Sequence, residues 1–253
     1  MKVITESLVY LNEFLEMIYP SNIKCICCEG ELENKVDFNI CGYCRSKIKF
    51  APVWSNLNIE NEYSQSYTKV LTVTEYNNAI RRLIYKFKYN SQTYIAREMA
   101  SIMANFLEKE NLSFDVIIPV PLYAAKKRKR GFNQAELLAK YLSKDIKVQY
   151  DINVLGRIKE TETMHMLTKE QRSENVKGVF SVENSTQTPF KNRSVILNAV
   201  ERVFWATEST QIEGKHILLV DDIYTTGATI KECSEVLLNA GTSKVTAVAF
   251  ARS

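Results

Sequence analysis

Hydrophobic residues recur along this 253-residue chain with the periods of strands and helices. The continuous apolar run at 217–220 is typical of a central parallel strand that is covered on both faces. Further strands are predicted at 70–74, 115–119 and 245–250. Apolar residues three and four positions apart predict helices at 4–18, around 80–87, at 92–108, from about 134, and at 230–239.

A polar stretch divides the chain into two parts. Residues 50–68 mix Pro, Ser, Asn and Glu, and we place there the boundary between an N-terminal module, 1–58, and a larger domain, 69–253. With 45% hydrophobic and 25% charged residues, the chain can bury a full core and one small appended module. The net charge of +4 is too small to argue for a nucleic-acid partner, so only local clusters of charge can do so.

The N-terminal stripe lacks the pattern of an export signal. Glu6, Glu13 and Glu16 interrupt it, and no stretch of the chain approaches the length of a membrane span. We therefore expect a cytoplasmic protein without membrane insertion.

Four cysteines form two pairs with the spacing of zinc knuckles. Cys25 and Cys28 are followed after twelve residues by Cys41 and Cys44, which predicts a structural four-thiolate Zn²⁺ site without an open position. The neighbouring Cys27 leaves open which thiolates of the first pair bind. Disulfide bonds are the alternative, but they are rare in the reducing cytosol, and a metal can replace a core in so small a module.

The most informative motif contains the central apolar run and reads ILLVDDIYTTGAT, residues 217–229. Asp221 and Asp222 stand at the expected carboxyl end of the strand, where open parallel sheets bind ligands. The residues after them open a helix whose dipole favours an anion, and they offer hydroxyl and backbone N–H groups. These residues are Thr225, Thr226, Gly227, Ala228 and Thr229.

This arrangement predicts a site for a phosphorylated ribose, with the ribose hydroxyls on the aspartates and the 5′-phosphate in the loop. Two other readings compete with it. The magnesium-holding strand of an ATPase also ends in acidic residues, but none of the eight glycines belongs to a P-loop pattern. A paired aspartate can also be a simple turn and helix cap.

The same segment resembles the phosphoribosyl pyrophosphate (PRPP) motif of type I phosphoribosyltransferases. Further segments resemble the ComF family of late-competence proteins. These segments are RRLIYKFKYN at 81–90, VIIPVPL at 116–122, RGFNQAELLA at 130–139 and the spaced residues Arg172, Asn175, Gly178 and Phe180. The resemblance implies an α/β protein with the type I phosphoribosyltransferase-like parallel sheet flanked by helices, together with a small N-terminal four-cysteine zinc module. It also implies Mg²⁺, held mainly by the oxygens of bound PRPP.

Two further loops take expected roles from their order in the family. The residues after the strand at 115–119 occupy the place of the pyrophosphate-binding loop, and Arg130 is expected to bind pyrophosphate. Residues 154–180 correspond to a flexible loop that closes over the site. Within it, Arg157 and Lys159 are the candidate catalytic residues, because a cation near the leaving pyrophosphate stabilises the departing charge.

Three features concern the second substrate. Met164 stands where the family commonly has glutamine, and an insertion at about 184–213 contains an apolar patch that predicts a helix or an added hairpin. Few residues follow the last predicted strand, so we expect the N-terminal half to supply the hood that holds an acceptor.

Two clusters of positive charge are candidates for contact with a polynucleotide. The predicted helix around 80–87 mixes basic residues with tyrosines, which can bind single strands by stacking and phosphate contact. The second cluster is a run of five cations beside the expected polyphosphate site. The candidates are Arg81, Arg82, Lys86, Lys88, Lys126, Lys127, Arg128 and Lys129. A solvated basic face is the alternative for each cluster.

Three functional hypotheses follow from the resemblance. The favoured one is a PRPP-binding protein that assists the uptake or handling of single-stranded DNA in natural transformation, alongside the DNA-uptake machinery and with or without phosphoribosyltransferase activity. The second is a phosphoribosyltransferase that acts on a soluble base or amine, as in salvage. The third is a non-catalytic regulator that senses PRPP. Glutamine amidotransfer is not expected, because it requires a separate ammonia-producing domain. The acceptor and the oligomeric state stay open.

Overall fold

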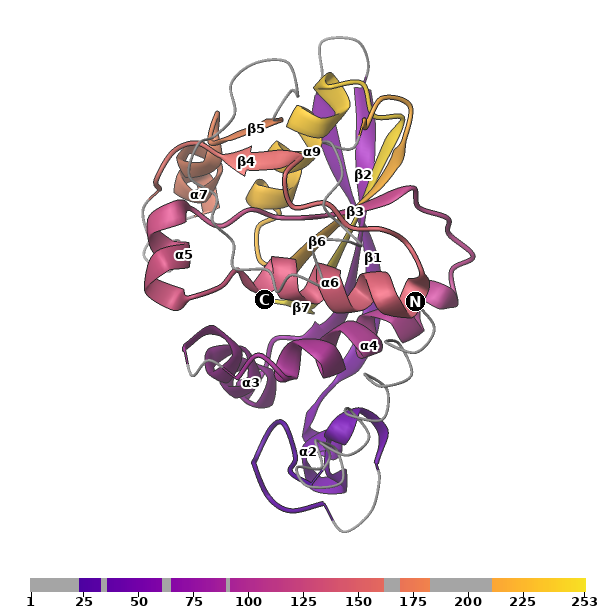
Figure 1. Ribbon diagram of the computed structural model, residues 1–253, viewed down its shortest axis with the longest axis vertical. Coiled ribbons are helices and arrows are strands. Elements are labelled where there is room, and N and C mark those ends of the chain that lie inside the picture. The colour runs from indigo at the N-terminus through magenta and orange to yellow at the C-terminus, as the bar shows by residue number, and fades with distance from the viewer. Residues whose placement is uncertain (1–22, 33–35, 61–64, 90–91, 162–168, 183–210) are drawn as a thin grey trace, which may run out of the picture.

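The computed structural model describes residues 23–32, 36–60, 65–89, 92–161, 169–182 and 211–253. A central β-sheet forms the middle of the larger domain (Figure 1). Within these ranges the sheet has five strands in the order β1-β2-β7-β6-β3. Four of them are parallel, and they are β2 (Gln65–Glu75), β7 (Lys244–Arg252), β6 (His216–Tyr224) and β3 (Val116–Pro119). Strand β1 (Phe50–Glu60) pairs antiparallel with β2 at the edge.

Helices cover both faces of this sheet, which explains why its central strands are apolar without alternation. On one face, Leu218 and Val220 of β6 pack in the same core as α3 (Asn78–Tyr89), α4 (Ile95–Glu108) and α6 (Gln134–Ile146). On the other face, Ile217 and Leu219 pack with α9 (Ala228–Asn239). The prediction of a strand buried on both faces at 217–220 is confirmed, since all four side chains are fully buried.

The smaller elements lie in two places, around the carboxyl ends of the parallel strands and in the N-terminal module. Helix α5 (Ala124–Arg130) follows β3, and β4 (Leu155–Arg157) pairs antiparallel with β5 (Phe180–Val182), with α7 (Lys169–Val176) between them in the chain. The N-terminal module contains the short helices η1 (Asp37–Asn39) and α2 (Gly42–Lys47). Its buried side chains, including Ile26, Ile40 and Ile48, belong to the same core as α3 and α4.

The polar stretch in which we placed the module boundary contains secondary structure. Residues 50–60 form β1, and residues 65–68 begin β2, so that both extend the sheet beyond β7. Because β1 is an edge strand and many of its side chains are exposed, it can carry Pro52 and several polar residues without breaking the core.

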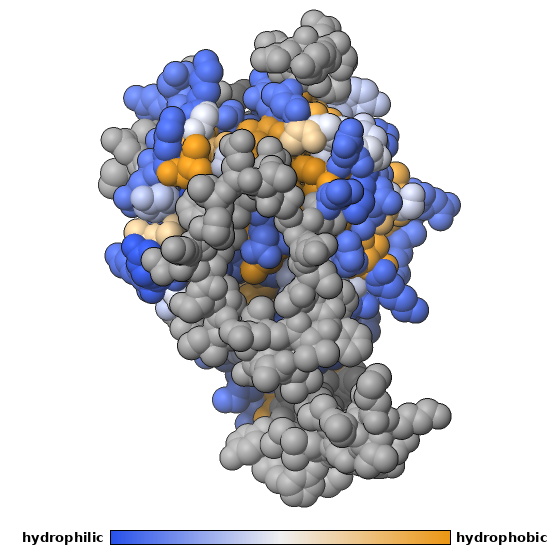
Figure 2. All heavy atoms as spheres, turned by 45° about the horizontal axis from the view of Figure 1, so that its top comes forward, coloured by the Kyte–Doolittle hydropathy of each residue, from blue (hydrophilic) through white to orange (hydrophobic). Residues whose placement is uncertain are grey.

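Two other predicted boundaries change, and two predictions fall outside the described residues. Helix α4 begins at Ile95 instead of position 92, and β6 continues to Tyr224, two residues past the aspartates at which we expected it to end. The predicted helix at 4–18 and the patch at 195–205 lie outside the described residues. Hydrophilic residues occupy much of the coloured surface in Figure 2, and none of the described helices has the length and hydrophobicity to cross a membrane.

Candidate functional site

A cavity of about 530 Å³ lies at the carboxyl ends of β3 and β6. Strand β3 pairs with β6 only as far as Val220, and beyond that point the chain after β3 leaves the sheet. The edge of β6 at Asp221 and Asp222 is therefore open, which is the place where open α/β sheets bind ligands. The cavity is lined by Lys88, Tyr89, Val120, Pro121, Leu122, Lys126, Lys129, Arg130, Asn133, Gln134, Ala135, Arg157, Thr161, Asp221, Asp222 and Thr229.

The two predicted aspartates both face this cavity, although they are neighbours in one strand. The backbone N–H of Asp222 donates a 2.8 Å hydrogen bond to Oδ1 of Asp221. Oδ2 of Asp222 lies 2.6 Å from Nζ of Lys88, which comes from the last turn of α3. Burial and the adjacent charge of Asp222 raise the pKa of Asp221 to about 8. The pair is thus partly neutralised, by Lys88 on one aspartate and by a favoured proton on the other.

A group of cations forms the opposite part of the cavity wall. Lys126 donates from Nζ to the carbonyl oxygen of Thr161 at 3.1 Å, and Arg157 donates from Nη2 to the Thr161 hydroxyl. Burial lowers the pKa of both cations, and the charge of Arg157 lowers that of Lys126 further. The guanidinium of Arg157 also lies 5.3 Å from the ring centroid of Phe180. Closely spaced, partly desolvated cations of this kind favour an anionic ligand with several oxygens.

The entrance of the cavity is formed by Arg130 and Tyr89. Nη1 of Arg130 donates a 2.6 Å hydrogen bond to Oε1 of Gln134, and its guanidinium lies 5.3 Å from the ring centroid of Tyr89. Asn133 caps α6 by accepting from the N–H of Ala135, and it donates to the carbonyl of Val120 at 3.0 Å. These bonds join the loop after β3 to the start of α6 and so hold one wall of the cavity in place.

The turn before α9 has the geometry expected of a tight loop at a helix start. Gly227 has φ of 81° and precedes the first turn of α9. A Cβ at this position would lie 2.8 Å from Cδ2 of Leu57 and 2.9 Å from Oη of Tyr224, so the position requires glycine. Of the five predicted loop residues, all of which are described, Thr229 is the one that lines the cavity. The other four are not among the residues that line it, and the Thr225 side chain is exposed.

The two candidate catalytic residues lie in different environments in the structure. Arg157 lines the cavity, whereas Lys159 is exposed and takes no part in the cavity wall formed by the described residues. Met164 lies outside the described residues. Arg157 is the last residue of β4 and Lys159 follows two positions later, so sequence order alone could not show which side chain faces the ligand site.

The candidate nucleic-acid residues divide into three groups. Lys88, Lys126 and Lys129 line the cavity. Lys86 pairs with Glu29 at 2.7 Å and Lys127 with Glu136 at 2.6 Å. The remaining side chains are exposed, and they are Arg81, Arg82 and Arg128. Sequence reasoning missed Lys88 and Tyr89 as cavity residues. The one signal for them was their position near the end of RRLIYKFKYN, residues 81–90, which resembles a segment of the ComF family.

The four cysteines predicted as metal ligands form a cluster in the N-terminal module. The Sγ atoms of Cys25, Cys28, Cys41 and Cys44 all lie within 4.8 Å of one another. The backbone N–H of Cys41 donates to Sγ of Cys25, and that of Cys44 donates to Sγ of Cys41, each at 3.4 Å. Such bonds favour the thiolate form that a metal needs. The donor set and its closeness fit a zinc module.

Cys27 lies outside this cluster. Its thiol is buried and is not one of the four that lie close together. Burial and the neighbouring Cys25 raise the pKa of Cys27 to about 12. The first knuckle therefore contributes Cys25 and Cys28 to the cluster.

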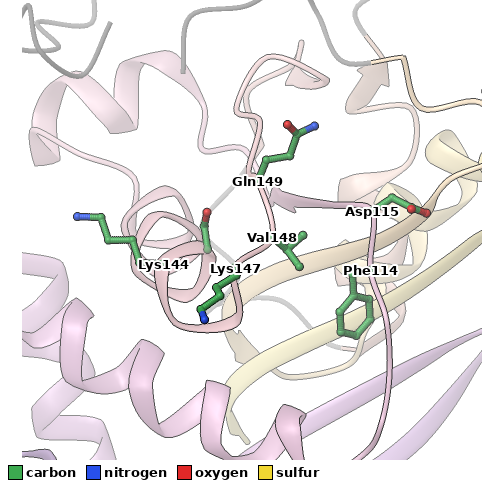
Figure 3. Close-up of a pocket in the computed structure, with 7 residues that line it drawn as sticks. Phe114, Asp115, Lys144, Lys147, Val148 and Gln149 are labelled. Atoms are coloured by element: carbon green, nitrogen blue, oxygen red, sulfur yellow. The ribbon is translucent and has the colours of Figure 1, made fainter. Parts of the chain in front are cut away.

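A second hollow lies at the opposite end of β3, and Figure 3 shows its residues. It measures about 660 Å³ and is lined by Phe114, Asp115, Ser143, Lys144, Lys147, Val148 and Gln149. Asp115 already accepts a 2.7 Å hydrogen bond from the N–H of His216. This hollow lies at the amino end of the strand, away from the aspartate pair, and it is lined by a single carboxylate and two lysines instead of the paired carboxylates and five cations of the smaller cavity.

Comparisons with known proteins match both parts of the chain. A family model described as "Phosphoribosyl transferase domain" matches residues 88–253. Competence protein F of Haemophilus influenzae is 27% identical over 248 residues, which cover 92% of this chain and 98% of that protein. DNA utilization protein YhgH of Escherichia coli (strain K12) is 28% identical over 214 residues, covering 81% and 74%. Competence protein ComFC of Bacillus subtilis is 25% identical over 235 residues, covering 90% and 82%.

Proposed function

Because this chain belongs to the phosphoribosyl transferase domain family, we propose that it is a ComF-type competence protein whose cavity binds PRPP. We further propose that it assists the uptake or handling of single-stranded DNA in natural transformation. The similarity to two competence proteins and a DNA utilization protein supports a competence-related role. The cavity chemistry supports the choice of ligand.

One observation carries the proposal of PRPP. The cavity brings two carboxylates of β6 to face five cations, which are Lys88, Lys126, Lys129, Arg130 and Arg157. The aspartates can accept hydrogen bonds from the ribose hydroxyls, and the cations can bind a pyrophosphate group. In this arrangement the 5′-phosphate lies at the start of α9, where N–H groups and the helix dipole favour an anion. Mg²⁺ is then held mainly by oxygens of the ligand.

A transferase reaction at this site would use the same residues. Pyrophosphate leaves C1 of the ribose as negative charge develops on it, and buried cations stabilise such charge. Arg157 and Lys126 are the cations whose pKa burial lowers, and a cation that is partly shielded from bulk water acts more strongly on a developing negative charge. In the described geometry Lys159 is a secondary candidate, since its side chain must move to reach the ligand.

Calorimetric titration of magnesium PRPP into the purified protein tests this proposal. The variant Asp221→Asn, Asp222→Asn removes both carboxyl groups with little change in size, and Asp115→Asn in the second hollow is the matched control. We expect binding by the wild type and the control, and a loss of about tenfold or more in the double variant, since hydrogen bonds to charged groups contribute about 1.5–3 kcal/mol each. A folded wild-type protein that does not bind PRPP would exclude the proposal.

For single-stranded DNA, we propose the exposed face of α3 as the principal contact. Tyr85 and Tyr89 are both 59% exposed, and their ring centroids lie 5.0 Å apart. Arg81 and Arg82 are exposed one helical turn before Tyr85, whereas Lys86 is already paired. Stacking on tyrosines and phosphate contact by arginines is a common mode of single-strand binding.

A salt titration distinguishes this surface from unspecific attraction. Binding of a fluorescent single-stranded oligonucleotide is followed by anisotropy at several salt concentrations. Replacing Arg81 and Arg82 by serine should lower the slope of log K against log salt by about 1.4, because each lost phosphate contact contributes about 0.7. Lys24→Ser serves as control, and an unchanged slope in the double variant would exclude α3 as the contact.

The four-cysteine cluster is proposed to hold a structural Zn²⁺ ion. Four thiolates leave no open coordination position, so the metal supplies stability and no catalysis. A reducing compartment keeps these thiols available, and the cytoplasm is the compartment that we propose.

A further inference from the structure

The last turn of α3 joins the N-terminal module to the candidate ligand site. Its four residues are Lys86, Phe87, Lys88 and Tyr89, and each contacts a different part of the molecule. Successive residues of an α-helix differ by about 100° in direction, so Lys86 and Lys88 leave α3 on nearly opposite sides. One lysine points to the cysteine cluster and the other to the aspartate pair.

Lys86 is held by the first cysteine knuckle. Its Nζ donates to the carbonyl oxygen of Cys27 at 2.9 Å and lies 2.7 Å from Oε1 of Glu29. Both partners belong to the turn that begins at Cys25, where the N–H of Glu29 donates to the carbonyl of Cys25 at 2.8 Å. The ammonium of Lys86 and the carboxylate of Glu29 thus form an ion pair across the boundary between α3 and this turn. The geometry of this turn therefore determines where the ammonium group of Lys86 finds its hydrogen-bond and ion-pair partners.

The next three residues of α3 shape the ligand cavity. The ring centroid of Phe87, which is fully buried, lies 5.8 Å from that of Phe132, directly before the cap of α6. Lys88 pairs with Asp222, and Tyr89 lies against Arg130 at the cavity entrance. A small rotation or shift of this turn would move a cation away from the aspartate pair and an aromatic ring away from the entrance.

The last turn of α3 is packed firmly, so a displacement of Lys86 on one side should also displace Lys88 and Tyr89 on the other. The Lys86 side chain is only 17% exposed, so the loss of its partners would leave an ammonium group with little access to water. The helix is also fixed along its length by the buried side chains of Ile80, Leu83 and Ile84. We expect the shape of the knuckle to depend on a metal shared by Cys25 and Cys28 with the second knuckle, because so small a module has little core of its own.

We propose that Lys86 is a positioning residue that couples the cysteine cluster to the ligand cavity. Metal in the cluster holds the turn at Cys25, the turn holds Lys86, and α3 thereby holds Lys88 and Tyr89 at the cavity. By thermodynamic reciprocity, a ligand that requires this position of Lys88 and Tyr89 must in turn strengthen metal retention by the same factor. The role of the cavity ligand in this scheme rests on the proposed PRPP function, whereas the link from the cluster to the end of α3 does not.

Hydrogen–deuterium exchange tests the link without any ligand. The zinc-loaded wild type, the chelator-treated wild type and the zinc-loaded variants Lys86→Met, Lys86→Arg and Lys24→Met are compared. Metal removal and Lys86→Met should both accelerate amide exchange in the last turn of α3 and leave α9 unchanged, while Lys86→Arg keeps the donors and slows exchange again. Lys24→Met removes a charge next to Cys25 without contact to α3, so it should behave as the wild type. Unchanged exchange in the last turn of α3 after metal removal would overturn the proposal.

A second measurement tests the coupling to the cavity. Zinc transfer to a coloured chelator is followed with and without magnesium PRPP. PRPP should strengthen zinc retention by about 5–150-fold in the wild type, the usual range of coupling between sites, and by much less in Lys86→Met. Equal retention with and without bound PRPP in the wild type would overturn the coupling. If the wild type binds no PRPP at all, the proposed ligand is wrong, and the exchange experiment still decides the link from cluster to helix.

Discussion

Replacement of Gly227 by alanine is the sharpest test of how the turn before α9 is built. The φ angle of 81° lies in the left-handed region, where a side chain costs about 1–2 kcal/mol. A Cβ would also lie 2.8 Å from Cδ2 of Leu57 and 2.9 Å from Oη of Tyr224, distances that force one of the neighbours to move. Over-packing of this kind costs about 1–3 kcal/mol more. Gly227→Ala should therefore lower the free energy of unfolding by about 2–5 kcal/mol in total.

Gly214→Ala separates the two causes. Gly214 has φ of 70°, but no atom lies within 4 Å of an added Cβ, so this variant should lose only about 1–2 kcal/mol. Urea unfolding followed by circular dichroism measures both variants, and Leu57→Ala combined with Gly227→Ala should recover part of the over-packing cost. Equal destabilisation by Gly227→Ala and Gly214→Ala would refute the close contact between β1 and the turn.

Three further predictions concern the cavity and the cysteine cluster. Because the pKa of Asp221 is raised to about 8 from an unfolded value of about 3.9, the folded protein keeps a proton that the unfolded chain releases between these values. The contribution of Asp221 to stability therefore falls as pH rises from about 4 to about 8, and thermal unfolding of Asp221→Asn should show a shallower decline in this range; identical slopes would contradict the raised pKa. Arg157→Met should weaken PRPP binding by about tenfold or more, while Lys159→Met changes it by less than about twofold, and calorimetry that finds the reverse order would contradict the geometry. Cys27→Ala should retain one metal ion per chain and Cys44→Ala should lose it, as measured by metal analysis; loss of the metal from Cys27→Ala would contradict this set of four ligands.

Short-range patterns in the sequence predicted the elements that carry the site. The apolar run at 217–220 became the buried part of β6, and the stripe of Ile80, Leu83, Ile84 and Phe87 became the buried face of α3. The spacing of four cysteines predicted their cluster. Each of these signals is local, since a helical or strand period and a knuckle spacing are set by the geometry of a few adjacent residues.

The roles of individual charged residues required the tertiary structure. Lys86, Lys88 and Lys127 belong to basic clusters in the sequence, yet each has an acidic partner in the fold, and the partner of Lys88 is one of the ligand-site aspartates. Glu29 and Asp222 are far from these lysines in the chain. A lysine has the same charge whether it is solvated or paired, so its sequence neighbours cannot show which state the fold selects.

The sequence by itself thus determined the strand, the aspartate pair, the four cysteines and the buried face of α3, because short repeats and spacings encode them. Only the tertiary structure decided that residues 50–60 extend the sheet, that Arg157 and not Lys159 faces the cavity, and that the last turn of α3 contacts both the cysteine module and Asp222. These features depend on which surfaces pack together after the chain has folded. Packing between distant segments is set by shape, burial and the pairing of charges, and no local period records it.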